Sequence, residues 1–212
     1  MDGLFFIFLV FLLVLGISKN LWFHEVLRAK KKWKKLADKH GWRLIHSDNF
    51  ELKYSPFKME LTYKGHPVVV EWQPFTLADN NIQELLNVSS DIMTEKFTKF
   101  TTTNNFKGEI AIKKKYGIQI LSSHLPEYLG SLSEASTGYE EYDRKFYVYA
   151  SSPELPSTFL TRQSISAHQI APYSSIYLCN GNLTLLCSGI LTEESKILSM
   201  LDLLSEINIS IN

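Results

Sequence analysis

The stretch Phe57-Lys-Met-Glu-Leu-Thr-Tyr-Lys-Gly-His-Pro-Val-Val-Val-Glu-Trp72 decides the fold class of this chain. Apolar and polar side chains alternate from Phe57 to Tyr63, and a second run rich in valine follows Lys64-Gly65. Alternation with a period of two places successive side chains on opposite faces of a strand. A Gly in a short polar break between two such runs is typical of a hairpin turn. The stretch therefore predicts a β-hairpin with one buried face.

Outward from this hairpin, short alternating runs continue through the rest of the chain. They predict further strands at 97–103, 109–115 and 145–150. Ser175–Cys179 and Leu183–Ser188 flank Asn180-Gly181, and Asn-Gly between two apolar runs is a strong signal for a tight hairpin. The Ser-rich and Gly-rich piece at 131–138 predicts a surface loop.

Helical signals are fewer and lie mostly in the last third of the chain. Short helices are expected at Ile82–Leu86, after Ser151-Ser152-Pro153-Glu154, and at Gln163–Gln169. A terminal helix opens at Thr192-Glu-Glu and has one apolar face, formed by Ile197, Met200, Leu201, Leu204 and Ile207. Strands and helices that do not alternate regularly predict an α+β fold, here an antiparallel-sheet domain with a C-terminal helix.

The N-terminal region is apolar. Leu4–Ile17 contains fourteen residues without a charged or polar side chain. A helix of this length spans about 21 Å, but apolar residues resume at 21–23, so the span lengthens if Lys19 extends toward the headgroups. Asp2, rather than a basic residue, precedes the run, which argues against a cleaved signal peptide. We predict a transmembrane anchor at 1–20; a cleaved signal peptide and a buried helix of a soluble protein are the alternatives.

The charge is distributed unevenly, although the 212 residues have a formal net charge of zero. Residues 1–43 carry nine Lys or Arg against three Asp or Glu, whereas the remainder carries 13 against 19. No basic residue precedes the apolar run and a dense cluster follows it. The positive-inside rule then predicts a single-pass membrane protein, with its N-terminus outside and everything after residue 20 in the cytoplasm.

Residues 21–41 show the pattern of an amphipathic helix. One stripe at spacings of three and four residues consists of Trp22, Val26, Ala29, Trp33, Leu36 and His40. A basic helix that carries tryptophan beside a membrane span is typical of an interfacial segment. The predicted membrane-surface residues are Arg28, Lys30, Lys31, Lys32, Trp33, Lys34, Lys35 and Lys39. Alternatively, the apolar stripe packs on the protein's own domain, which we expect to occupy 42–212.

Two segments carry a resemblance to a known group. They are YEEYDRKFYVYASSPELPSTFLT at 139–161 and the pattern W-x-x-L-A-x-x-x-G-W from Trp33 to Trp42. In these segments the chain resembles an uncharacterised group of bacterial single-pass membrane-anchored proteins with a β-rich cytoplasmic domain of unknown function. The resemblance implies the same fold and a location in the bacterial cytoplasmic membrane, and it carries no catalytic residues.

Residues that could carry chemistry form no recognised motif. The sequence contains no His-Glu-x-x-His, no Gly-x-Ser-x-Gly and no phosphate-binding Gly-rich loop. Cys179 and Cys187 fall at different heights of the second hairpin, more than about 10 Å apart, beyond the reach of a disulfide. We expect both cysteines to be plain core residues; the alternative is a catalytic cysteine with His168 as its base. We expect Glu140-Glu141-x-Asp143 to be a turn in which Asp143 caps the backbone; the alternative is a cation site.

These observations favour a non-catalytic, membrane-anchored accessory or scaffold protein, such as a subunit of a membrane protein complex. The expected partners are the lipid bilayer and a membrane protein. We expect no cofactor, metal, small-molecule substrate or nucleic-acid partner. The alternatives are a membrane-tethered enzyme and a protein that binds lipid or nucleic acid through its lysine cluster.

Overall fold

The computed structural model describes residues 24–46, 57–74, 96–115, 132–170 and 174–210. Within these ranges the chain forms one sheet of nine strands in the order β1-β2-β3-β4-β9-β8-β5-β7-β6, with neighbours antiparallel. The strands are β1 (Arg43–His46), β2 (Phe57–Tyr63), β3 (His66–Pro74), β4 (Lys96–Thr103), β5 (Ile110–Lys114), β6 (Ser133–Glu134), β7 (Phe146–Ala150), β8 (Ser174–Cys179) and β9 (Asn182–Ser188). The predicted α+β fold with a large antiparallel sheet is confirmed.

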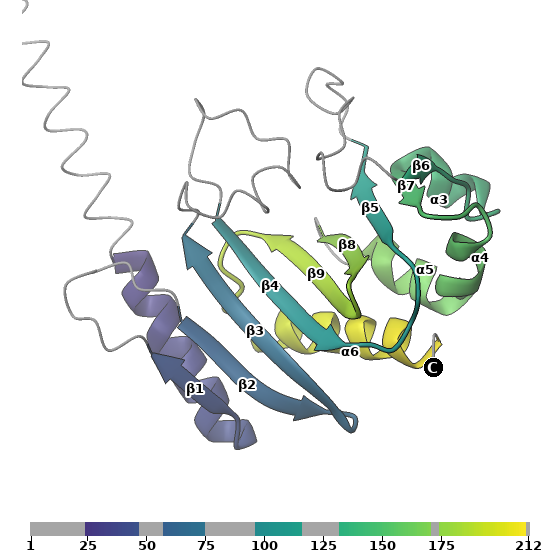
Figure 1. Ribbon diagram of the computed structural model, residues 1–212. Coiled ribbons are helices and arrows are strands. Elements are labelled where there is room, and N and C mark those ends of the chain that lie inside the picture. Colours follow the sequence, from purple (N-terminus) through teal and green to yellow (C-terminus); the bar gives the residue numbers. More distant parts are fainter. Residues whose placement is uncertain (1–23, 47–56, 75–95, 116–131, 171–173, 211–212) are drawn as a thin grey trace, which may run out of the picture.

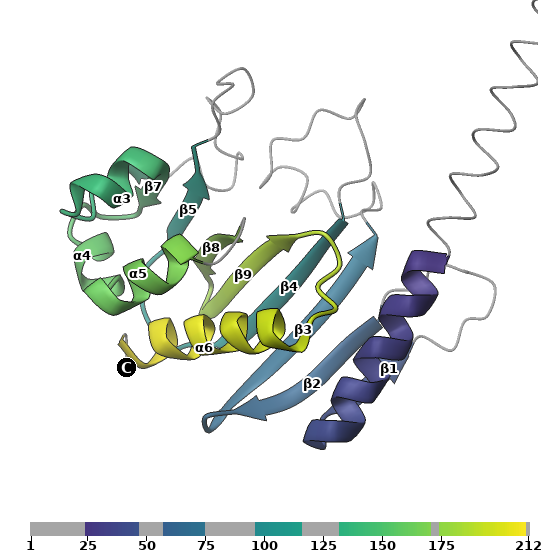
Figure 2. The ribbon, with the colours of Figure 1, turned by 180° about the vertical axis from the view of Figure 1, so that it is seen from behind.

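The helices are 24–40, α3 (Glu140–Lys145), α4 (Leu155–Phe159), α5 (Arg162–Ile170) and α6 (Glu194–Ser210). Helix 24–40 and α6 lie on the same face of the sheet (Figures 1 and 2). The predicted apolar positions of α6, from Ile197 to Ile207, are buried, which confirms this helix and its apolar face. Each buried Leu or Ile side chain contributes about 1.5–3 kcal/mol through the hydrophobic effect.

Both predicted hairpins are present. β2 and β3 join at Lys64-Gly65, where both residues have positive φ (49° and 86°), and β8 and β9 join at Asn180-Gly181 in the same way (50° and 71°). Positive φ at both central residues is the geometry of the tight turn that matches the twist of the two strands. In β2, Phe57, Met59 and Leu61 face the core, as the alternating pattern predicts.

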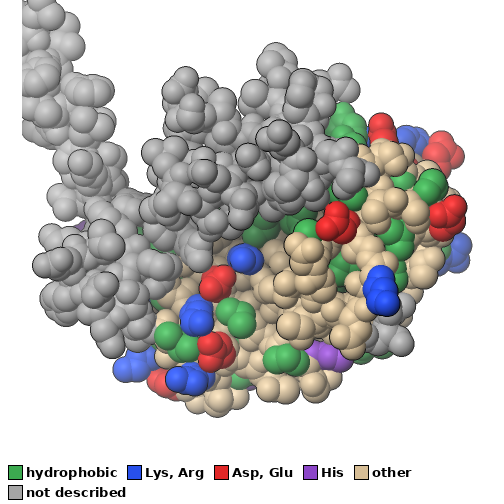
Figure 3. Space-filling view, in the orientation of Figure 1, with side chains coloured by type: hydrophobic (Ala, Val, Ile, Leu, Met, Phe, Trp, Pro, Cys, Tyr) green, Lys and Arg blue, Asp and Glu red, His purple; other side chains and the backbone are tan. Residues whose placement is uncertain are grey.

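The face of the sheet that points away from the helices is lined by charges of both signs around β2, β3 and β4. Lys58 lies 3.1 Å from Glu60, and Lys99 lies 3.7 Å from Glu71. Figure 3 shows this side of the molecule, where acidic and basic side chains are interspersed. In these two pairs the charges of opposite sign offset each other.

Helix 24–40 belongs to the core of the domain. Val26, Ala29, Trp33, Leu36 and Ala37 are buried in the same hydrophobic cluster as the apolar face of α6. The apolar stripe is covered by the sheet and by the segment before α6, so helix 24–40 packs on the domain, whereas the division of the chain into 21–41 and 42–212 stays a prediction. The alternative, in which the stripe packs on the protein's own domain, is confirmed for these side chains.

Several predicted elements differ in their bounds. The acidic segment expected as a turn is the short helix α3, and the loop predicted at 131–138 contains the two-residue strand β6. Helix α4 begins at Leu155, after Ser151-Ser152-Pro153-Glu154. Helix α5 begins one residue before the predicted Gln163, because the hydroxyl of Thr161 accepts a hydrogen bond from the Ser164 amide at 3.1 Å and caps the first turn. The helix predicted at Ile82–Leu86 lies outside the described residues.

Asp143 caps the backbone before its own helix. Its carboxylate accepts hydrogen bonds from the Thr137 amide at 3.1 Å, the Thr137 hydroxyl at 2.7 Å and the Ser136 hydroxyl at 2.6 Å. Partial burial raises the pKa of Asp143, but these hydrogen bonds and the charge of Lys115 outweigh burial, so that the pKa lies below its usual range. The carboxylate thereby joins α3 to the segment that connects β6 to it.

Replacing Asp143 with alanine is expected to lower the free energy of unfolding by about 1–3 kcal/mol, because buried donors lose a charged acceptor. Since the pKa of Asp143 is lowered on folding, its contribution is present above the unfolded pKa of about 3.9 and disappears as the pH falls through the folded value. Urea unfolding of the wild type and the variant at several pH values measures this. Equal stabilities at pH 7 would contradict the assignment of Asp143 as a cap.

Candidate membrane-binding surface

The outer side of helix 24–40 carries two rows of side chains. Arg28, Lys32, Lys35 and Lys39 follow one another at spacings of four, three and four residues and form one row. Leu27, Lys31 and Lys34 form the other row by the same spacing, and all members of both rows are exposed. The helical period thus places six cations on the side opposite to the buried stripe.

Trp33 was predicted to lie at the membrane surface, but the structure places it in the core of the domain. Its side chain is fully buried, its indole N–H donates a hydrogen bond to the carbonyl of Leu191 at 2.7 Å, and its ring packs edge-on against Phe57 with centroids 4.7 Å apart. A side chain held in this way cannot reach a bilayer. Trp33 instead attaches the helix to the sheet and to the segment before α6.

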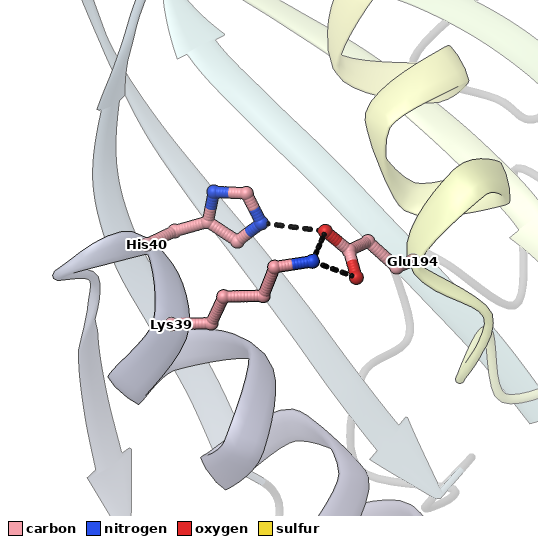
Figure 4. Close-up of polar contacts among 3 residues, drawn as sticks. All are labelled: Lys39, His40 and Glu194. Carbon is pink, nitrogen blue, oxygen red and sulfur yellow. Dashed lines mark hydrogen bonds and ion pairs between the residues drawn. The ribbon is translucent and has the colours of Figure 1, made fainter.

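Three of the predicted cations also contact the domain. Figure 4 shows Lys39 and His40 converging on Glu194, with the Lys39 ammonium and the His40 ring nitrogen each 2.8 Å from a carboxylate oxygen. Lys32 donates to the Thr192 hydroxyl at 3.4 Å, and Lys30 lies 5.7 Å from the centre of the Phe57 ring. Hydrogen bonds from Lys39 and His40 lower the pKa of Glu194, and burial lowers the pKa of Lys30. These contacts join the helix to the start of α6 and to β2.

The other cations face solvent. Within the described part of the chain, no acceptor lies at hydrogen-bond or ion-pair distance from Arg28, Lys31, Lys34 or Lys35. Leu27, one of two large apolar side chains described as exposed, lies among them with 38% of its surface accessible. An apolar side chain flanked by cations is suited to the interface of an anionic bilayer, where each Lys or Arg contributes about 1 kcal/mol.

A groove opens beside the first turns of this helix. Its volume is about 380 Å³, and it is lined by His24, Glu25, Arg28, Ala29, Lys32, Ile190 and Thr192. One wall is the helix, and the other is the segment that connects β9 to α6. The sequence could not indicate this groove, because its two walls are separated by about 160 positions in the chain.

His168 is a core residue rather than a catalytic base. Its Nε2 lies 3.0 Å from the carbonyl oxygen of Ser174, which can only accept, so Nε2 carries the proton and Nδ1 accepts from the Tyr142 hydroxyl at 2.6 Å. Burial lowers the pKa of His168 to about 4 and outweighs the hydrogen bond to Ser174, which raises it. Both ring nitrogens are therefore occupied, and no hydrogen bond joins this ring to a thiol.

The cysteines are not poised as nucleophiles. Cys187 lies opposite Ser174 in the sheet and Cys179 opposite Asn182, so the two sulfurs belong to different ends of the hairpin. Burial raises the pKa of Cys187 to about 12, and burial together with a hydrogen bond to Glu109 raises that of Cys179 to about 11. Both remain thiols at neutral pH, whereas a nucleophilic cysteine needs a lowered pKa. The alternative of a catalytic cysteine paired with His168 is not supported by this geometry.

Among the described residues, no three or more His, Cys, Asp or Glu side chains lie together as metal ligands would. None of the described helices combines the length and apolar character needed to cross a bilayer. The predicted anchor at 1–20, and Trp22 at the start of the predicted apolar stripe, lie outside the described ranges.

Comparison with known proteins gives a likeness in fold. No family model matches the chain, and no curated protein matches it, so the resemblance to the uncharacterised bacterial group stays a prediction. The crystal structure of the mycobacterial trehalose monomycolate transport factor A, TtfA, is similar, with a TM-score of 0.54 over 87% of this chain and 94% of that chain. At 10% sequence identity this similarity shows that the two proteins share a fold.

Proposed function

We propose that this chain is a non-catalytic accessory subunit of a membrane protein complex, anchored by residues 1–20 and held with its domain against the cytoplasmic leaflet. One observation carries this proposal. Helix 24–40 buries its apolar stripe in the domain, and yet Arg28, Lys31, Lys34 and Lys35 remain exposed and without an acceptor among the described residues. These cations are not needed to attach the helix, so they are available to an anionic surface.

The short distance between the anchor and the domain supports the same role. The first buried residue of the helix is Val26, only a few residues after the predicted span. Because this connection is short, the domain stays close to the bilayer and presents a defined side to a neighbouring membrane protein. A structurally similar protein is named as a transport factor, which is compatible with an accessory role for this fold.

Lysine labelling of the full-length chain in nanodiscs tests the surface contact. We expect Lys31, Lys34 and Lys35 to be acetylated several-fold more slowly in nanodiscs with anionic lipid than in neutral ones, because the ammonium groups contact headgroups. Lys107 and Lys145 are exposed on the domain outside this helix and serve as internal controls whose rates should not change. Equal rates for both sets of lysines in both lipids would contradict contact through this helix.

Protease accessibility tests the orientation. In intact cells the domain should resist added protease, and it should be digested once the inner membrane is opened. The protein should also remain in the membrane fraction after washing with high salt, since the span, and not the lysine contacts alone, retains it. Digestion in intact cells, or a mature chain that begins after Ser18, would disprove the proposed anchor and topology.

A further inference from the structure

The groove beside helix 24–40 combines features that suit a phosphate group. Arg28 and Lys32 lie one helical turn apart on one wall, and the hydroxyl of Thr192 lies on the other. Ala29, which is buried, lines the groove between them. The volume of about 380 Å³ is at the lower end of ligand sites, which matches a headgroup better than a whole lipid molecule.

The groove is lined by two cations, Arg28 and Lys32, and by one acid, Glu25, so positive charge prevails. The acids that begin α6 are already paired: Glu194 with Lys39 at 2.8 Å, and Glu193 with Lys196 at 2.9 Å. The guanidinium of Arg28 has no acceptor within the described part of the chain, and Lys32 makes only the long 3.4 Å contact to Thr192. A guanidinium presents paired donors that match two phosphate oxygens, so Arg28 is the residue best suited to bind this group.

We propose that this groove binds the phosphate of one anionic phospholipid headgroup, through Arg28, Lys32 and the Thr192 hydroxyl. The inference rests on the proposed function, because the groove lies at the end of the helix nearest the predicted span and hence at the level of the headgroups. Phosphatidylglycerol is an anionic lipid whose headgroup carries such a phosphate.

Native mass spectrometry of the full-length chain released from detergent micelles, with phosphatidylglycerol or phosphatidylcholine added, tests this site. We expect one phosphatidylglycerol to remain bound to the wild type, and its apparent affinity to fall at least about tenfold in the double variant Arg28→Ala/Lys32→Ala. The matched control Lys107→Ala/Lys145→Ala removes the same charge from exposed positions of the domain outside this helix and should retain the lipid. Thr192→Val, which keeps the side-chain volume, should weaken binding without affecting the fold.

Each outcome separates this site from the surface contact. If both double variants lose lipid equally, the lysines act only as a diffuse charge and the groove is not a binding site, although the proposed function stands. Undiminished binding to Arg28→Ala/Lys32→Ala also overturns the site. Displacement of the lipid by millimolar inorganic phosphate would assign the groove to a soluble anion instead. Unchanged circular dichroism shows that the variants are folded, as expected for exposed side chains.

Discussion

Replacing Trp33 with alanine is expected to lower the free energy of unfolding by about 3–5 kcal/mol, the usual effect of removing a fully buried tryptophan. The loss includes the edge-on contact with Phe57 and the hydrogen bond to the Leu191 carbonyl. Urea unfolding of the full-length chain in detergent, followed by circular dichroism, measures this change. The effect is large because Trp33 joins the helix to both the sheet and the segment before α6.

Trp33→Phe is the matched control for this experiment. It keeps most of the aromatic volume and removes the indole N–H, so a smaller loss of about 1–3 kcal/mol is expected from the unsatisfied Leu191 carbonyl. A loss below about 1 kcal/mol for Trp33→Ala would mean that the helix does not belong to the core. In that case the apolar stripe would be available to lipid, as predicted from the sequence for an interfacial helix.

Acidification from pH 6.5 to pH 4 is expected to lower the stability of the domain by about 3 kcal/mol through His168 alone. The folded pKa of His168 is about 4 because burial disfavours the charged ring, and the nearby Lys114 adds to this effect. Below the unfolded pKa of about 6.5 the unfolded chain binds a proton that the folded chain does not. Each unit of acidification in this window therefore favours unfolding by about 1.4 kcal/mol.

His168→Leu isolates this contribution. The variant leaves the Tyr142 hydroxyl and the Ser174 carbonyl without their partner, so it should be less stable at pH 7 by about 1–3 kcal/mol for each unsatisfied group. The difference in stability between wild type and variant should then shrink as the pH falls from 6.5 to 4. A difference that does not depend on pH would show that the ring is accessible to protons in the folded state.

Local patterns in the sequence predicted the local structure well. The turns at Lys64-Gly65 and Asn180-Gly181 require positive φ, and their flanking runs alternate, so both hairpins followed from short-range chemistry. The apolar face of α6 followed from helical spacing. The order of strands did not follow: β5 lies between β8 and β7, and pairing between strands distant in the chain leaves no mark in local periodicity.

The candidate site was predicted in part, because an apolar stripe on a helix is suited both to a protein core and to contact with a bilayer. Cations at spacings of three and four residues predicted the exposed rows correctly, whereas Trp33 suits a bilayer interface and a protein core equally. The small side chains of Ala29 and Ala37 beside it are a signal of close packing against another element, and both are buried. Ile190 and Thr192 of the groove could not be associated with the helix from sequence, since only tertiary structure brings them to it.

The hydrogen bond from Trp33 to Leu191 also constrains how the protein is made. The two residues are 158 positions apart, so the ribosome, at about 5–20 residues per second, needs roughly 8–30 seconds to supply the acceptor after the tryptophan. During that interval Trp33 can pack against Phe57, which is synthesised soon after it, but its indole N–H lacks the Leu191 carbonyl. The helix is therefore attached to all of its partners only after the segment before α6 has been made.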